Sequence, residues 1–165
     1  MPIEVAAPEA KVEAVTGPVL FAYDGSELAA LAIEQAGREL AGGREALVLC
    51  VWQPADVGFV LTAERTFDAD QASQVQRAAE EVAANGAKLA GTAGFRSQSM
   101  AVQASPTWKG IVETAAAHKV SLIVLGSHRR RGLEKYLLGS VAAAVVAHCE
   151  ASVLVVHQLP WVATP

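Results

Sequence analysis

The residues best suited to chemistry lie in the stretch from Ser121 to Ser140, where two glycines flank a basic segment. The stretch begins with the apolar run 122–125, which has no polar alternation and is typical of a strand buried on both faces. Gly126 interrupts this run, and Gly139 precedes the run SVAAAVVAH, which predicts a helix. A strand, a glycine loop and a helix start in this order direct free backbone N–H groups toward the carboxyl edge of a parallel sheet. The stretch therefore predicts a site for an anion.

A second candidate residue, Asp24, lies in the turn YDGSELAAL, directly after the apolar run 19–23. At the carboxyl edge of a sheet its carboxylate could contact a ribose, a base or a metal ion. The alternative is an Asx-turn, in which the carboxylate only stabilises the bend. The turn has neither the GxGxxG of a dinucleotide-binding fold nor the GxxxxGK[ST] of a P-loop, which argues against both classes.

No set of residues predicts catalysis or a dedicated metal site. His128 could take part in phosphoryl chemistry, but no carboxylate or lysine has a spacing that would make it the partner that acid–base catalysis needs. Cys50 and Cys149 show neither a CxxC pattern nor a His/Cys ligand spacing, so we interpret them as small buried apolar residues. We predict a protein that is not an enzyme and has no metal ligands of its own.

Composition and charge narrow the class of protein. The chain has 165 residues, the size of one domain, and 52% of them are hydrophobic. Its net charge of −4 argues against nonspecific binding to nucleic acid or to an anionic membrane, and the arginines 129–131 are too few to reverse this. No apolar stretch approaches the roughly 20 residues that span a bilayer, and the first residues do not resemble a signal peptide. We therefore predict a cytoplasmic protein.

The elements that must position these residues alternate along the chain. Apolar runs predict five strands, at 19–23, 46–52, 95–102, 122–125 and 152–156. Helical periodicity predicts four helices between them: one capped by Ser26, one over 69–90, one capped by Ser105 with Pro106 at its first position, and one over 140–148. The second has an apolar stripe that includes Leu89 and Gly86, and we predict that Gly86 packs closely against a neighbour. This order predicts an α/β fold, a three-layer, doubly wound sandwich around a parallel sheet.

The motifs together resemble the universal stress protein family over residues 18–157. The resemblance rests on the triplet 24–26 after the first strand, on 49–52 at the end of the second, and on the block LGSHRRRGLEKYLLGSVAAAVVAHCEASVLVV. It implies a Rossmann-like fold similar to that of adenine nucleotide alpha hydrolases, with strand order 3-2-1-4-5, and usually a dimer. We expect this order also because it places the switch point of the sheet beside Asp24 and Gly126.

Some members of this family bind ATP and others do not. In the members that bind it, the motif is a glycine, two residues, a second glycine, nine residues, a third glycine and then Ser or Thr. Gly126, Arg129, Gly139 and Ser140 occupy these positions here, so Arg129 replaces the second glycine. Either its guanidinium blocks the phosphate pocket, or it turns outward and binds phosphate through two hydrogen bonds. The sequence leaves both outcomes open.

The resemblance implies ATP or AMP as the ligand, with or without Mg²⁺. Asp24 and Val51 would face the adenosine. The phosphates would lie against the glycine loop and the helix start that follows it, at Gly126, Gly139, Ser140 and Val141.

For the chain as a whole, we predict a mobile leader at 1–16, a universal stress protein domain at 17–158 and a tail at 159–165, with a long loop at 53–68 inside the domain. The first functional hypothesis is a regulatory, non-catalytic module that binds an adenine nucleotide. The alternative is a nucleotide-independent stress protein that acts through its dimer or partner surfaces. In both cases we expect a homodimer through the strand 152–156, an edge strand with few charges, and through Trp161.

Overall fold

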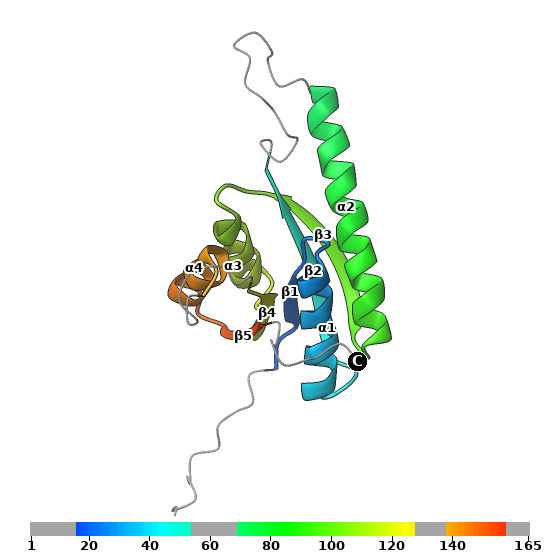
Figure 1. Cartoon of the computed structure of the whole chain (residues 1–165), viewed down its shortest axis with the longest axis vertical. Helices are drawn as coiled ribbons and strands as arrows, with labels where there is room; N and C mark the ends of the chain where they lie inside the picture. The colour runs from blue at the N-terminus through cyan, green and yellow to red at the C-terminus, as the bar shows by residue number, and fades with distance from the viewer. Residues whose placement is uncertain (1–15, 54–68, 128–137, 158–165) are drawn as a thin grey trace, which may run out of the picture.

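The protein is built around a five-stranded sheet with helices on both faces, as the computed structural model shows (Figure 1). The structure describes residues 16–53, 69–127 and 138–157. None of the helices within these ranges has the length and apolar composition that crossing a membrane requires. The elements are, in chain order, β1 (Val19–Ala22), α1 (Glu27–Glu39), β2 (Glu45–Trp52), α2 (Ala69–Thr92), β3 (Arg96–Gln103), α3 (Thr107–Ala117), β4 (Leu122–Gly126), α4 (Ser140–His148) and β5 (Ser152–Val156).

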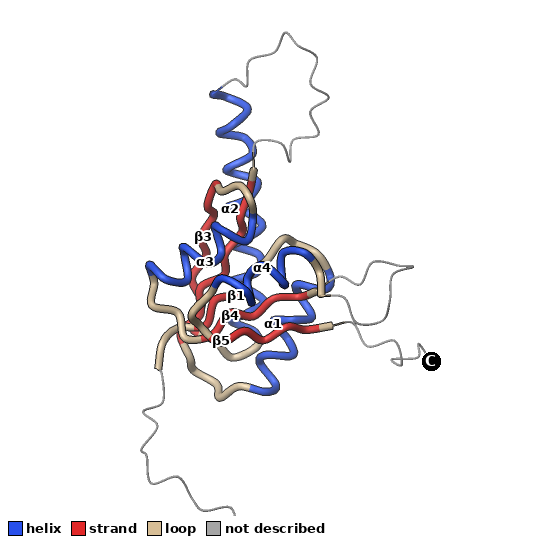
Figure 2. The backbone as a smooth tube through the Cα atoms, turned by 90° about the vertical axis from the view of Figure 1, so that its left-hand side faces the viewer, coloured by secondary structure: helices blue, strands red, loops and turns tan. Residues whose placement is uncertain are grey.

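The strands are parallel and follow the order β3-β2-β1-β4-β5, which confirms the predicted topology. In Figure 2, β3 lies on one side of β1, and β4 and β5 lie on the other. The central strand β1 pairs Phe21 with Val48 of β2 and with Val124 of β4. Because the chain leaves β1 toward β2 on one side and later returns at β4 on the other, the carboxyl ends of these strands form the switch point.

Each face of the sheet has its own apolar core. Helices α1 and α2 cover one face (Figure 1). Phe21 and Ile33 are buried there, and the rings of Phe21 and Phe95 meet edge to face with their centroids 5.1 Å apart. Helices α3 and α4 cover the other, where Leu20 and Ile111 are buried. Successive residues of β1 thus enter opposite cores, which explains why this strand is apolar without alternation.

Helix α2 continues through Gly86, as predicted. A Cβ atom on Gly86 would lie 2.6 Å from Cδ1 of Tyr23 and 2.7 Å from Cγ1 of Val48, so the helix can reach the sheet here only with a glycine. The predicted stripe is wrong at Leu89, which is 36% exposed. The residues that this helix buries against the sheet are Ala79, Ala83, Gly86 and Ala90. Because these buried residues are four, three and four positions apart, the buried stripe includes Ala90 and leaves Leu89 on the outer side of the helix.

The predicted N-cap of α1 is confirmed, and the predicted N-cap of α3 is wrong. Ser26 caps α1, because its Oγ accepts a hydrogen bond from the Ala29 N–H at 3.1 Å. Helix α3 begins at Thr107, and its N-cap is Pro106, which provides no side-chain hydrogen bond. Pro106 has an extended ψ of 162°, and its carbonyl accepts from the Lys109 N–H at 3.1 Å. The proline therefore precedes the helix instead of opening it, and Ser105 lies one residue too early to act as the cap.

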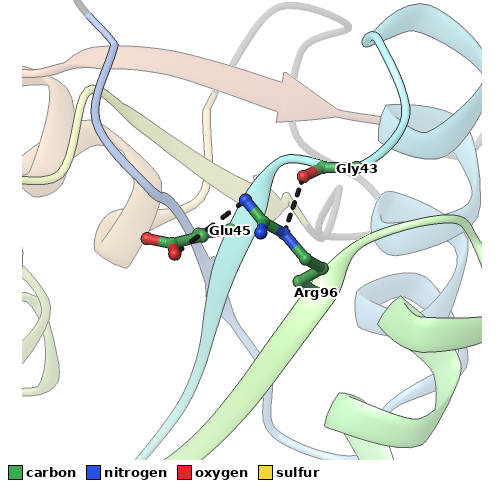
Figure 3. Close-up of polar contacts among 3 residues, drawn as sticks. All are labelled: Gly43, Glu45 and Arg96. Carbon is green, nitrogen blue, oxygen red and sulfur yellow. Dashed lines mark hydrogen bonds and ion pairs between the residues drawn. The ribbon is translucent and has the colours of Figure 1, made fainter.

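Polar contacts connect residues at the amino edge of the sheet. Nε of Arg96 donates to the Gly43 carbonyl at 3.0 Å, and the guanidinium lies 3.9 Å from the Glu45 carboxylate (Figure 3). Both side chains of this ion pair are exposed, so it contributes little to stability. The Ser121 hydroxyl donates to the Gly17 carbonyl at 2.8 Å and accepts from the guanidinium of Arg44 at 2.9 Å. These bonds join the segments that lead into β1 and β4.

Candidate functional site

A cavity of about 160 Å³ opens at the carboxyl edge of the sheet, among the ends of β1, β2 and β4. Four of the predicted site residues line it: Asp24, Val51, Gly126 and Val141. They come from different parts of the chain, and the switch point of the sheet brings them together. The first turns of α1, α3 and α4 complete the walls.

Asp24 shapes the first turn and also faces the cavity. Its Oδ1 accepts a hydrogen bond from the Ser26 N–H at 2.9 Å, which is the Asx-turn predicted as an alternative. Gly25 between them has a φ of +83°, a value that favours glycine. Because the carboxylate is exposed at the cavity, the structural role of Asp24 does not prevent contact with a ligand.

The floor of the cavity is apolar. Leu49, Ile111 and Leu125 line it and are each at most 3% exposed. Sequence reasoning did not assign these residues to the site, although the strand ends at Leu49 and Leu125 could have indicated two of them. Apolar walls with a few polar groups at the rim are typical of a site for a small organic molecule.

Helix α3 is held close to the end of β2. A Cβ atom on Gly110 would lie 2.7 Å from the Cβ of Ala104 and 3.1 Å from Cγ1 of Val51. Nε2 of Gln53 donates to Oγ1 of Thr107 at 2.9 Å. Thr107 lines the cavity and was also missed from sequence, because its place depends on how closely α3 approaches β2.

Gly126 permits an equally close contact on the other side. A Cβ atom on Gly126 would lie 2.7 Å from Cγ of Leu28 and 3.1 Å from its carbonyl oxygen. The packing of α1 against β4 therefore requires a glycine here, whether or not a ligand binds.

The start of α4 lies at the same edge as Asp24, which agrees with the predicted arrangement. Gly139 is the N-cap of α4, and its N–H donates to Oγ of Ser127 at 2.8 Å. Among the described residues, Val141 lines the cavity, whereas Gly139 and Ser140 do not. Arg129 and His128 lie outside the described residues, so the structure does not place the replaced glycine of the motif.

One ionisable group at the cavity, the phenol of Tyr23, has a shifted pKa. Burial raises the pKa of Tyr23 above its ordinary value of 10.0, and the negative charge of Asp24 raises it further, so the phenol stays protonated at neutral pH. In the three described ranges, no three His, Cys, Asp or Glu side chains gather closely enough to hold a metal ion. Cys149 lies near the amino edge, where burial raises the pKa of its thiol, and Cys50 is buried.

Comparison with known proteins points to one family. The model of the universal stress protein family matches residues 16–157. Universal stress protein MJ0531 of Methanocaldococcus jannaschii is 48% identical over 48 residues, an alignment that covers 29% of this chain and only 28% of that relative. Among solved structures, the hypothetical protein MJ0577 superposes with a TM-score of 0.70 at 25% identity, over 88% of this chain and 98% of its own.

Two more distant structures share the fold and contain a ligand. A universal stress protein in complex with cAMP has a TM-score of 0.53 at 23% identity, and the match covers 86% of this chain and 97% of that one. The universal stress protein from Archaeoglobus fulgidus in complex with dAMP has a TM-score of 0.55 at 20% identity, and the match covers 86% and 98%.

Proposed function

Because the chain belongs to the universal stress protein family, we propose that its carboxyl-edge cavity binds an adenine nucleotide, ATP or AMP. The observation that carries this proposal is the meeting of Asp24, Val51, Gly126 and Val141 around one cavity with an apolar floor. The cAMP and dAMP bound by two proteins of the same fold support the class of ligand.

In this proposal each part of the nucleotide meets a different part of the site. The adenine ring lies on the apolar floor beside Val51, and the ribose hydroxyls hydrogen-bond to the carboxylate of Asp24. The phosphates lie at the start of α4, where the N–H groups of Ser140 and Val141 and the helix dipole favour negative charge. Mg²⁺, where present, would be bound through the phosphates, since it usually keeps several waters and few protein ligands.

We propose that the nucleotide acts as a signal and is not turned over. The hydroxyls at the cavity already serve the fold: Ser26 caps α1, and Thr107 accepts a hydrogen bond from Gln53. A nucleophile needs a neighbouring base, and the protonated Tyr23 cannot act as one. Among the described residues at the cavity, Asp24 is the remaining candidate base, and its Oδ1 already accepts the Ser26 N–H. In this proposal hydrolysis would therefore depend mainly on positioning.

The first test concerns Arg129, which replaces a glycine of the motif and is the reason for the nucleotide-independent alternative. We expect wild-type protein to bind ATP, and Arg129→Gly to weaken ATP by about 1.5–3 kcal/mol, the value of a charge-assisted hydrogen bond, while adenosine binding stays unchanged. Calorimetric titration of ATP and adenosine, with and without Mg²⁺, measures both affinities. Arg130→Gly is the matched control for the loss of one positive charge.

Other results of this titration would change the proposal. If Arg129→Gly gains ATP binding that the wild type lacks, the arginine blocks the pocket, and the nucleotide-independent function is favoured. If neither protein binds ATP or adenosine, the nucleotide proposal is wrong.

We further propose that the regulatory unit is a homodimer formed through β5. This strand lies at the edge of the sheet, and Val153, Leu154 and Val155 are only partly buried in the single chain. Val146 of the neighbouring helix α4 is 50% exposed. Association along β5 would cover unpaired backbone groups and this apolar surface together.

The dimer is tested by sedimentation at micromolar concentration. We expect wild-type protein to sediment as a dimer and Val153→Lys as a monomer, because the lysine charge would lie within the apolar surface that the interface covers. Gln98→Lys, on the opposite edge strand β3, is the control and should leave the dimer intact. A wild-type monomer, or a Val153→Lys dimer, would contradict this interface.

A further inference from the structure

We propose that Ser127 is a positioning residue for the phosphate side of the site, because its hydroxyl sets the place of the first turn of α4. The inference rests on the proposed nucleotide site and adds a residue that does not line the cavity. Ser127 directly follows β4 and is 2% exposed, so its hydroxyl is enclosed by protein. Its Oγ accepts the Gly139 N–H at 2.8 Å, across 12 residues of sequence.

The backbone on the Ser127 side of this bond is firmly held. The Ser127 N–H donates to the Val156 carbonyl at 3.0 Å, which continues the pairing of β4 with β5. The preceding Gly126 packs against Leu28 so closely that a Cβ atom would not fit. The Oγ of Ser127 is therefore a fixed acceptor on the sheet, and the start of α4 is positioned relative to it.

The Gly139 side of the bond determines where the helix points. The Gly139 carbonyl accepts the first hydrogen bond of α4, from the Ala143 N–H at 2.8 Å. Gly139 is thus held to the sheet through its N–H and to the helix through its carbonyl. The next two residues, Ser140 and Val141, follow in the first turn, and their N–H directions depend on this anchor.

Two of the helix starts at the cavity, those of α1 and α4, have their first N–H groups paired in different ways. In α1, Ser26 accepts the N–H of Ala29 within its own first turn. Helix α4 has Gly139 as N-cap and no side-chain cap, and Ser127 binds the N–H of the cap residue itself. This arrangement fixes the start of α4 while it leaves the N–H groups of its first turn for an anion, such as the phosphates of a nucleotide.

The experiment compares Ser127→Ala with wild-type protein in calorimetric titrations of ATP and adenosine. We expect ATP affinity to fall about tenfold or more and adenosine affinity to change less than about twofold, because only the phosphate side loses its anchor. Ser127→Thr retains the hydroxyl and should recover most of the ATP affinity. Ser97→Ala is the control, since it removes a partly buried hydroxyl at the opposite edge of the sheet, whose Oγ donates to the Ala87 carbonyl at 2.6 Å.

Amide hydrogen exchange of the ligand-free proteins gives a second readout. We expect faster exchange at Gly139 in Ser127→Ala and unchanged exchange there in Ser97→Ala. Unchanged exchange at Gly139, unchanged ATP affinity, or an equal loss of ATP and adenosine in Ser127→Ala would each overturn the positioning role. If wild-type protein binds neither ligand, the proposed function fails first, and the role of Ser127 toward phosphate fails with it.

Discussion

Phe21→Ala is expected to lower the free energy of unfolding by about 3–5 kcal/mol, the range for removing a large aromatic side chain from a packed core. Phe21 is 1% exposed in the central strand and packs edge to face against Phe95. The void left by the ring would lie between β1 and the helices α1 and α2. It could not close unless these elements moved relative to the sheet. Urea denaturation measures the effect as a lower midpoint at unchanged slope.

The control for this variant is a truncation of the same kind at an exposed site. Leu89→Ala, on the outer side of α2 at 36% exposure, should change stability by less than about 1 kcal/mol. Similar losses in Phe21→Ala and Leu89→Ala would contradict the core described above.

Gly86→Val is expected to destabilise the protein by about 3 kcal/mol, near the upper end of the range for overpacked cores. The new Cβ would lie 2.6 Å from Cδ1 of Tyr23 and 2.7 Å from Cγ1 of Val48, and two further methyl groups would follow. Helix α2 would have to move away from β1 and β2. Thermal and urea denaturation of the variant measure this loss.

Gly91→Val is the matched control in the same helix. A Cβ atom there has Oγ of Ser97 at 3.7 Å, an ordinary contact, and valine is a slightly better helix former than glycine. We expect this variant to be as stable as the wild type or slightly more stable. If both variants lose the same stability, the cause is a general effect on the helix and not the contact of Gly86 with the sheet.

The fold could be predicted from sequence because its inner strands, β1, β2 and β4, are buried on both faces. Residues 19–22 enter two cores in alternation, so the strand is apolar throughout, and the glycines and helical stripes between such runs separate the elements clearly. The errors were local. Ser105 was expected to cap α3, and Leu89 was expected inside the stripe of α2, because sequence periodicity does not fix the rotation of a helix or the residue at which it begins.

The candidate site was predicted only in part, because some of its residues follow from the order of the elements and others depend on how closely the elements pack. Residues at strand ends, such as Asp24 and Gly126, follow from the order of elements, since parallel strands bring their carboxyl ends to one edge. Thr107 and Ile111 line the cavity because α3 approaches Val51 through Gly110, a contact between elements that no local pattern contains. Gly139 was assigned to the ligand from its motif, whereas its N–H already has a partner in Ser127.

The pairing of β1 with β4 has a consequence for the order in which the protein folds. Ser121 reaches Gly17 across 104 residues of sequence, and β1 and β4 pair directly beyond this contact. Closing so long a loop costs conformational entropy before the pairing can compensate for it, so contacts of this kind form slowly. During synthesis, β1 can pair with β2 early, but it can pair with β4 only after the roughly 100 residues between them have left the ribosome. The cavity has walls on both sides of β1, so a growing chain acquires it only after β4 and the start of α4 have been made.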